Sequence, residues 1–291
     1  MKVFVSGATG FQGGNIAQQL IKNGHSVTTL KRSEGGIPSS EIEVVKGGLE
    51  HKEALNKALK PVDAAVYTFP LVFDVDLAEE YTSNFISAAQ EAKVPLVVFN
   101  AGFDLTEKGE GKVVLEIKAK IKRLLNASDL EVITLVPDVY LDNISAPWSI
   151  PVIRNNSIVP YPVASGKKIP WISHKDLSKY VAAAVEKPEL SGKVLPIGGN
   201  LFTGEEITAA IASKIGQELH YAPLTPDEFE KQIAPVFGAL AGKEISNLYR
   251  YVASNREQII AKDFKHTQDL LGVVPETLTE WVSSVNWKLP V

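Results

Sequence analysis

Three glycines near the start of the chain have the spacing of a phosphate-binding turn. They occur in the stretch VFVSGATGFQGG as a GxxGxxG arrangement, which differs from the better-known GxGxxG fingerprint. An apolar run precedes them, and a segment of helical composition, residues 11–23, follows. A glycine turn in this position lets the backbone approach a pyrophosphate, and the helix N-terminus attracts its negative charge. The stretch predicts a dinucleotide site, with a purely structural turn as the alternative. The candidate residues are Gly7, Thr9, Gly10, Phe11, Gln12 and Gly13.

Two cations follow the second apolar run, HSVTTL. NAD-binding turns usually place an acidic residue there to bind the ribose 2′-hydroxyl, but this chain has Lys31 and Arg32. A carboxylate would repel a 2′-phosphate, whereas a guanidinium binds it through two hydrogen bonds. The pair therefore favours NADP(H) over NAD(H) as the cofactor; a pair of solvated surface cations is the alternative.

The elements that must position these residues alternate between short apolar runs and helical segments. Apolar runs without alternation are typical of strands buried on both faces, so the order predicts an α/β fold with a doubly wound parallel sheet. The expected strands are KVFVSG, HSVTTLK, IEVVKG, AAVYTF, PLVVFNAG and EVITLVP. The expected helices after the first span residues 52–59, 75–92 and 113–127.

The pattern changes after Pro137. Residues 138–170 are rich in proline and are expected to form loops, while residues 171–199 contain a helix and a strand that return to the first domain. Thr203 and Thr225 each begin a capping box, so the last third is expected to be mainly helical. We therefore expect the doubly wound domain to span residues 1–137 and a smaller region to span residues 138–170 and 200–291.

Composition limits the classes of function. A net charge of −4 argues against a basic nucleic-acid-binding face, and the absence of cysteine excludes disulfides and thiolate chemistry. No apolar run approaches the length of a membrane span, and no spacing of histidines or carboxylates suggests a metal site. A cytoplasmic protein that acts on a small molecule, as a monomer or a homodimer, is the expectation.

Several motifs resemble the NmrA-like family of atypical short-chain dehydrogenases, with its isoflavone-reductase and quinone-reductase relatives. GATGFQGG is similar to the family's GATGxxG turn, and Arg32 stands at its NADP-selecting arginine. SDLEVITLVPDVYLDN and the tail DLLGVVPETLTEWV resemble two further family segments, so the likeness spans nearly the whole chain. The resemblance implies a Rossmann domain with a smaller substrate region over the nicotinamide end of the cleft.

The chain also departs from the wider superfamily, whose members use a YxxxK pair in which the tyrosine protonates the substrate oxygen. Lys118 lies where the family's lysine is expected, but Val114 stands four residues before it and has no proton to give. Carbonyl reduction by the usual tyrosine route is therefore not expected. Lys118 is the candidate catalytic residue, as a hydrogen-bond donor to the nicotinamide ribose; a solvated cationic helix face is the alternative.

The remaining candidates lie at strand ends and in the loop-rich segment. Thr68, Phe69 and Pro70 follow the fourth strand and are expected to line the middle of the cofactor, or else to form a simple turn. Asn100 ends the fifth strand, where a serine is common in relatives. Tyr140 and Asn143 are candidates for substrate contact, with core and capping roles as equal alternatives.

Two hypotheses of function remain. One is an NADPH-dependent oxidoreductase acting on quinones or similar acceptors, which take hydride without a dedicated tyrosine acid. The other is a non-catalytic sensor that binds NADP(H) and reports redox state to a protein partner.

Overall fold

The chain divides into two compact units in a computed structural model that describes residues 1–32, 40–106 and 108–288. The first unit comprises Met1–Pro137, His174–Ile197 and Phe264–Val273. The second comprises Asp138–Ser173, Gly198–Asp263 and Val274–Val291. Each unit is described by itself below.

A seven-stranded parallel sheet forms the centre of the first unit. Its strand order is β10-β6-β5-β4-β1-β2-β3, and every neighbouring pair is parallel. The order reverses between β1 and β4, as in the doubly wound dinucleotide-binding fold. The strands are β1 (Lys2–Val5), β2 (Ser26–Lys31), β3 (Ile42–Lys46), β4 (Ala64–Thr68), β5 (Val97–Asn100), β6 (Val132–Pro137) and β10 (Val194–Ile197). The prediction of a Rossmann-type parallel sheet is confirmed.

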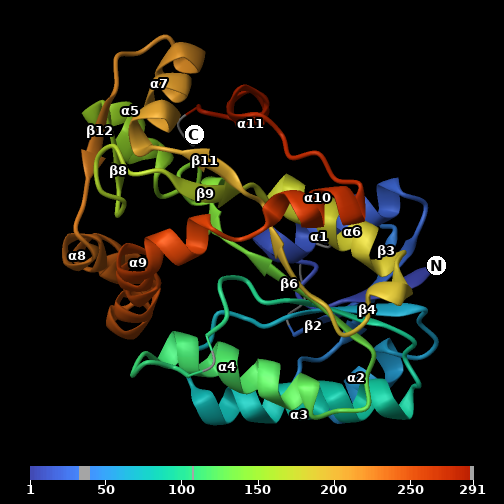
Figure 1. The fold of residues 1–291 in the computed structure, drawn as a ribbon. Coiled ribbons are helices and arrows are strands. Elements are labelled where there is room, and N and C mark those ends of the chain that lie inside the picture. The colour runs from blue at the N-terminus through green and yellow to red at the C-terminus, as the bar shows by residue number, and fades with distance from the viewer. Residues whose placement is uncertain (33–39, 107, 289–291) are drawn as a thin grey trace. The chain divides into compact units, whose positions relative to one another are not determined.

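Helices cover both faces of this sheet (Figure 1). One layer holds three helices that pack side by side: α2 (Lys52–Ala58), α3 (Val75–Glu91) and α4 (Val113–Asn126). The other holds α1 (Phe11–Lys22), α6 (His174–Val185) and α10 (Phe264–Leu271). The helices expected from the sequence appear within one or two residues of their predicted ends. The place of α10 in this unit was not expected.

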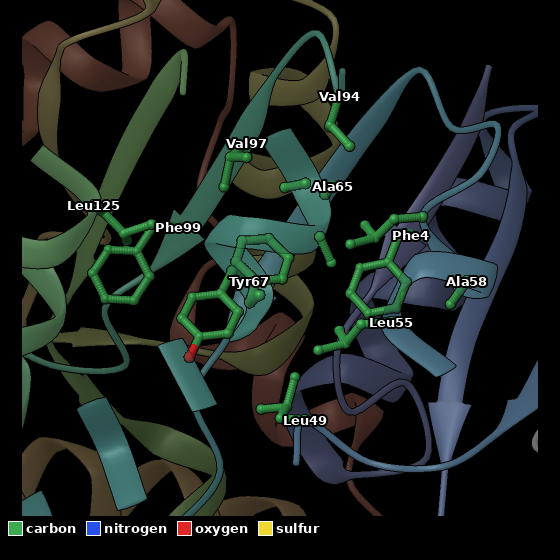
Figure 2. Packing of buried hydrophobic residues seen from close by; sticks show 14 of the residues in the cluster. Phe4, Leu49, Leu55, Ala58, Ala65, Tyr67, Val94, Val97, Phe99 and Leu125 are labelled. Atoms are coloured by element: carbon green, nitrogen blue, oxygen red, sulfur yellow. The ribbon is translucent and has the colours of Figure 1, made fainter. Parts of the chain in front are cut away.

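Apolar side chains fill the space between the sheet and the layer of α2, α3 and α4 (Figure 2). Tyr67 of β4 lies at the centre, where its ring stacks on Phe85 of α3 with centroids 4.4 Å apart. The Tyr67 hydroxyl is buried and shares a hydrogen bond of 2.9 Å with Thr82. This pairing satisfies the one polar atom of the ring, so a tyrosine is tolerated at 0% exposure inside an apolar core.

The second unit contains short strands and most of the remaining helices. One sheet joins β7 (Val139–Tyr140), β9 (Ile169–Ile172) and β11 (Asn200–Phe202), and β8 (Ile158–Tyr161) pairs with β12 (His220–Pro223). The helical elements are η1 (Leu141–Asn143), α5 (Ile150–Asn156), α7 (Gly204–Ile215), α8 (Pro226–Phe237), α9 (Ala239–Ile260) and α11 (Leu278–Ser284). The 3₁₀ turn η2 (Pro188–Leu190) belongs to the first unit.

The helix starts of this unit follow their capping residues. Thr203 and Thr225 each accept a hydrogen bond from the backbone N–H three residues on, and Glu206 and Glu228 each accept one from the backbone N–H of the capping threonine. Both predicted capping boxes are present. Residues 138–170, expected to be loops, instead contain β7, β8, β9 and α5. Pro160 and Pro170 lie within two of these strands, and proline inside a run argues against a strand from sequence alone.

Candidate functional site

The glycine turn lies at the carboxyl end of β1, beside the point where the strand order reverses. β2 and β3 lie on one side of β1, and β4, β5, β6 and β10 lie on the other. Open parallel sheets bind their ligands outside the carboxyl ends of the strands at such a reversal, which here lies between β1 and β4.

The three glycines of the turn meet three different steric requirements. Gly7 has φ +71°, a left-handed conformation that other residues adopt at a cost. Gly10 is exposed, and a Cβ there would lie no closer than 3.4 Å to the Gly7 carbonyl oxygen. Gly13 is buried, and a Cβ there would lie 2.2 Å from the same oxygen. Gly7 makes the turn, Gly10 leaves its outer surface open, and Gly13 lets α1 pack against the turn.

Helix α1 begins at this turn with Gly10 as its N-cap. No side chain caps the helix, and no acidic residue lies in its first turn. Thr9 and Phe11 are exposed there, the Phe11 side chain at 63%. An N-terminus without a carboxylate retains its attraction for an anion.

Ser6 joins the ends of β1 and β4. Its hydroxyl donates to the Thr68 carbonyl oxygen over 2.9 Å and accepts from the Thr68 N–H over 2.7 Å. Thr68 is thereby fixed at the end of β4, next to the glycine turn. Sequence reasoning named Thr68 and missed Ser6, although a small polar residue directly after an apolar strand was a usable signal.

Asn100 connects the end of β5 to helix α1. Its amide donates to Gln12 Oε1 over 2.9 Å, and its Oδ1 accepts from the Gly102 N–H over 3.0 Å. The side chain is 1% exposed and lies 3.4 Å from the Thr68 hydroxyl. The structure thus brings together Gln12, Thr68 and Asn100, three residues that were named separately from the sequence.

Lys118 points from α4 toward the loop after β5. Its ammonium donates to the Ala101 carbonyl oxygen over 2.5 Å and lies 3.5 Å from the position of a Cβ on Gly102. Burial lowers the pKa of Lys118 to about 8, and the nearby carboxylate of Asp104 offsets part of that effect. The lysine is partly buried, so it is not part of a solvated cationic face. Val114, one turn earlier, is buried and apolar.

The two cations follow the second strand of the sheet. Lys31 is the last residue of β2 and is partly buried, whereas Arg32 is exposed just beyond it. β2 is the neighbour of β1, so both residues lie at the same edge of the sheet as the glycine turn.

Phe69 and Pro70 continue from the end of β4 and are partly buried. The Phe69 ring packs against the core beside Tyr81, with centroids 6.5 Å apart, and the Pro70 carbonyl oxygen accepts a hydrogen bond from the Val72 N–H. Both residues therefore shape the loop after β4, beside the exposed Leu71.

The two predicted substrate residues lie in the second unit. Tyr140 in β7 is 6% exposed. Asn143 in η1 is partly buried, and its amide donates to the Tyr161 hydroxyl over 3.4 Å. That hydroxyl lies 2.6 Å from the hydroxyl of Tyr249. No sequence motif points to Tyr161 or Tyr249, because 88 residues separate them along the chain.

Within the ranges that the structure describes, three or more histidine, aspartate or glutamate side chains never gather as they would to hold a metal ion. The same ranges contain no helix with the length and apolarity needed to cross a membrane.

Strand order and glycine turn together define a Rossmann-type fold. Residues 1–282 match the NmrA-like family. The chain belongs to the NmrA-like family.

The chain is similar in sequence to one named protein and in fold to two solved reductase structures. The chain is 26% identical over 210 residues to the photosystem II assembly factor Ycf39 of Synechocystis; the match covers 69% of this chain and 63% of that relative. Among solved structures, the triphenylmethane reductase of Citrobacter sp. complexed with NADP(H) superposes with a TM-score of 0.80 at 16% identity, covering 98% of this chain and 100% of that one. The NADPH-dependent quinone oxidoreductase QOR2 of Escherichia coli, complexed with NADPH, gives 0.72 at 20% identity, with 97% and 99% covered. At these identities the structural likeness shows the fold.

Proposed function

We propose that the protein is an NADP(H)-dependent reductase that acts on a quinone-like or other small conjugated acceptor. The observation that carries the proposal is the glycine turn at the point where the strand order reverses. Its exposed glycine, its helix start without a side-chain cap and the first turn of α1 without an acidic residue fit a pyrophosphate. The reductases with NADP(H) or NADPH in their structures support this choice of cofactor.

Arg32 and Lys31 carry the proposed preference for NADP(H). A guanidinium beyond β2 is able to bind a 2′-phosphate through two hydrogen bonds, and the neighbouring ammonium adds attraction. Lys31 and Arg32 lie at the same edge of the sheet as the glycine turn, on the β2 side of the point where the strand order reverses. This arrangement supports the proposal that the adenine end of the cofactor lies on the β2 side.

Lys118 and the β5 loop carry the proposed nicotinamide end. The bound cofactor supplies a hydride. Lys118, held by the Ala101 carbonyl, donates a hydrogen bond to a ribose hydroxyl and orients the ring. Thr68, Phe69 and Pro70 line the middle of the site, and the Gln12–Asn100 hydrogen bond fixes the turn against β5.

The apolar Val114 limits the class of acceptor. Val114 lies one turn before Lys118, and its side chain has no proton to donate. Helix α4 therefore provides no tyrosine that could protonate the alkoxide formed when a carbonyl takes up a hydride. A quinone does not need a dedicated acid from the protein. It takes up the hydride and a proton to give a hydroquinone, and the proton can come from water. The structural neighbour QOR2, a quinone oxidoreductase, supports a quinone as the acceptor.

The test follows the near-ultraviolet absorbance of NADPH with a panel of quinones and enones. We expect oxidation of NADPH with at least one quinone, and a strong reduction of the rate in Lys118→Met. Lys120→Met is the matched control, since Lys120 lies on the same helix but pairs with Glu79. If the wild-type protein does not bind NADPH, the proposal as a whole is contradicted.

A non-catalytic NADP(H)-binding regulator is the second candidate. Two observations favour it: Val114 in place of an acid, and a relative named for assembly rather than for catalysis. NADPH binding without turnover across the panel, together with a nucleotide-dependent change in hydrogen exchange, would select this candidate.

A further inference from the structure

The loop that joins β3 to α2, residues 47–51, is fixed by hydrogen bonds and by packing. The Gly47 N–H donates to the Lys31 carbonyl oxygen over 3.0 Å, which ties the end of β3 to the end of β2. The Leu49 side chain is buried in the core (Figure 2), and the Leu49 carbonyl oxygen accepts a hydrogen bond of 3.1 Å from the Asn84 amide. The side chains of this loop therefore have fixed positions at the carboxyl end of β3.

The Glu50 side chain folds back over Gly48. A Cβ on Gly48 would lie 2.4 and 2.6 Å from the two carboxylate oxygens of Glu50, so the carboxylate occupies the space that a side chain at position 48 would fill. The Glu50 side chain is 30% exposed, so a ligand at the protein surface is able to reach the carboxylate. Glycine at position 48 thus lets Glu50 place a negative charge directly beyond β3.

The Glu50 carboxylate is free to accept a hydrogen bond from a ligand. His51 Nδ1 lies 3.4 Å from Glu50 Oε1, but this nitrogen accepts a hydrogen bond of 3.2 Å from the Gly48 N–H and so carries no hydrogen for the carboxylate. Within residues 1–32, 40–106 and 108–288, no other donor binds the Glu50 oxygens. A carboxylate accepts several hydrogen bonds, so this position favours a ligand that brings a donor.

The ends of β2 and β3 offer complementary chemistry side by side. Lys31, the last residue of β2, pairs in register with Lys46, the last residue of β3. The cations Lys31 and Arg32 suit an anionic phosphate, whereas Glu50 suits a neutral group that donates a hydrogen. The adenosine 2′-phosphate end of NADP(H) carries both kinds of group, the phosphate on its ribose and an exocyclic amino group on its base.

We propose that Glu50 binds the adenine base of the cofactor by accepting a hydrogen bond from the exocyclic amino group. The inference rests on the proposed NADP(H)-dependent function and adds the residue that recognises the base. A hypoxanthine base carries an oxygen in place of this amino group. Two acceptors would then face each other without a hydrogen between them, so Glu50 selects adenine over hypoxanthine.

The test compares NADPH with its hypoxanthine analogue, in which an oxygen replaces the adenine amino group. Both dinucleotides are titrated into the full chain by calorimetry, so the measurement does not depend on turnover. We expect the wild type to bind NADPH about 10- to 100-fold more tightly than the analogue, the value of one hydrogen bond to a charged group.

Two variants assign this preference to the Glu50 carboxylate. Glu50→Gln is expected to bring the two affinities to within about threefold, because an amide presents either a donor or an acceptor to the base. Gly48→Ala is expected to reduce the preference to the same extent, since its methyl group takes the place of the carboxylate and turns the flexible side chain away.

Glu53→Gln is the matched control. Glu53 carries the same charge three residues further along the chain and is exposed in the first turn of α2, so this variant is expected to keep the preference of the wild type. Thermal unfolding checks that each variant is folded.

Three results would count against the proposal. A wild type that binds NADPH and the analogue equally overturns it and leaves the reductase function intact. An unchanged preference in folded Glu50→Gln also overturns it, and Gly48→Ala decides the matter should Glu50→Gln fail to fold. A wild type that binds neither dinucleotide contradicts the proposed cofactor, and the role of Glu50 with it.

Discussion

Gly13 packs against Gly7 so closely that no side chain fits between helix α1 and the turn: a Cβ on Gly13 would lie 2.2 Å from the Gly7 carbonyl oxygen. The obstructing atom belongs to the backbone, so it cannot rotate away. The third glycine of the motif is therefore required by packing inside the protein, whether or not a nucleotide is bound.

Gly13→Ala is expected to lower the free energy of unfolding by about 1–3 kcal/mol, the usual cost of overpacking. Urea denaturation measures the change. Gly14→Ala is the control, since its Cβ meets the Ala8 carbonyl oxygen at an ordinary 3.4 Å, and it is expected to change stability by less than about 1 kcal/mol. Equal losses in the two variants would contradict this packing role.

Gly10→Ala is expected to separate binding from stability. A methyl group at this exposed position meets only ordinary contacts in the protein, so unfolding should change by less than about 0.5 kcal/mol. The same methyl group would stand between the backbone and a pyrophosphate, so affinity for NADPH should fall. Unchanged NADPH affinity would place the pyrophosphate elsewhere.

Arg32→Ala is expected to weaken NADPH binding by about tenfold to a hundredfold and to leave NADH binding unchanged. The reason is the loss of one charged contact to the 2′-phosphate, which NADH lacks. Calorimetric titration with both nucleotides measures it, and Arg123→Ala, an exposed arginine of α4, is the control. An equal loss of affinity for NADH in Arg32→Ala would contradict a role of Arg32 in binding the 2′-phosphate.

Lys118 is expected to make NADPH binding depend on pH. Burial lowers the pKa of Lys118 to about 8, so the ammonium that is proposed to bind the ribose is lost as the pH rises above 8. NADPH affinity of the wild type should therefore fall between about pH 8 and 10. Lys118→Arg, which keeps its charge in this range, should show no such fall. A parallel decline in both proteins would assign the titration to another group.

Gln12 and Asn100 are expected to contribute jointly to stability. A double-mutant cycle with Gln12→Ala and Asn100→Ser should give a coupling of about 0.5–1.5 kcal/mol in urea denaturation, the value of their hydrogen bond. Asn84→Ser offers the comparison, since Asn84 is a buried asparagine that donates to the Leu49 carbonyl oxygen instead. Its effect should add to that of Gln12→Ala without coupling.

The parallel sheet and its first helix were predictable because their signals are local. The apolar runs and the glycine spacing determine which segments form strands and where the turn lies. Contacts between the ends of different strands were not predictable in the same way. The Ser6–Thr68 and Gln12–Asn100 hydrogen bonds depend on strand order, which residue spacing does not encode.

The second unit was harder to predict from the sequence because its strands are short and three of them contain proline. Pro160 lies in the two-stranded sheet of β8 and β12, where strand edges tolerate a missing N–H. Tyr161 and Tyr249 come from a strand and a helix far apart in the sequence, and no motif links them.

The assignment of α10 to the first unit has a consequence for how this protein can be divided. The chain passes between the two units after residues 137, 173, 197, 263 and 273. Helix α10 packs against β10 and α6, so the unit with the parallel sheet is completed by a segment that follows residues 198–263 of the second unit. No single cut therefore releases either unit whole. During synthesis on the ribosome the first unit lacks α10 until residues 198–263 of the second unit have been made, so its folding should finish only after that point.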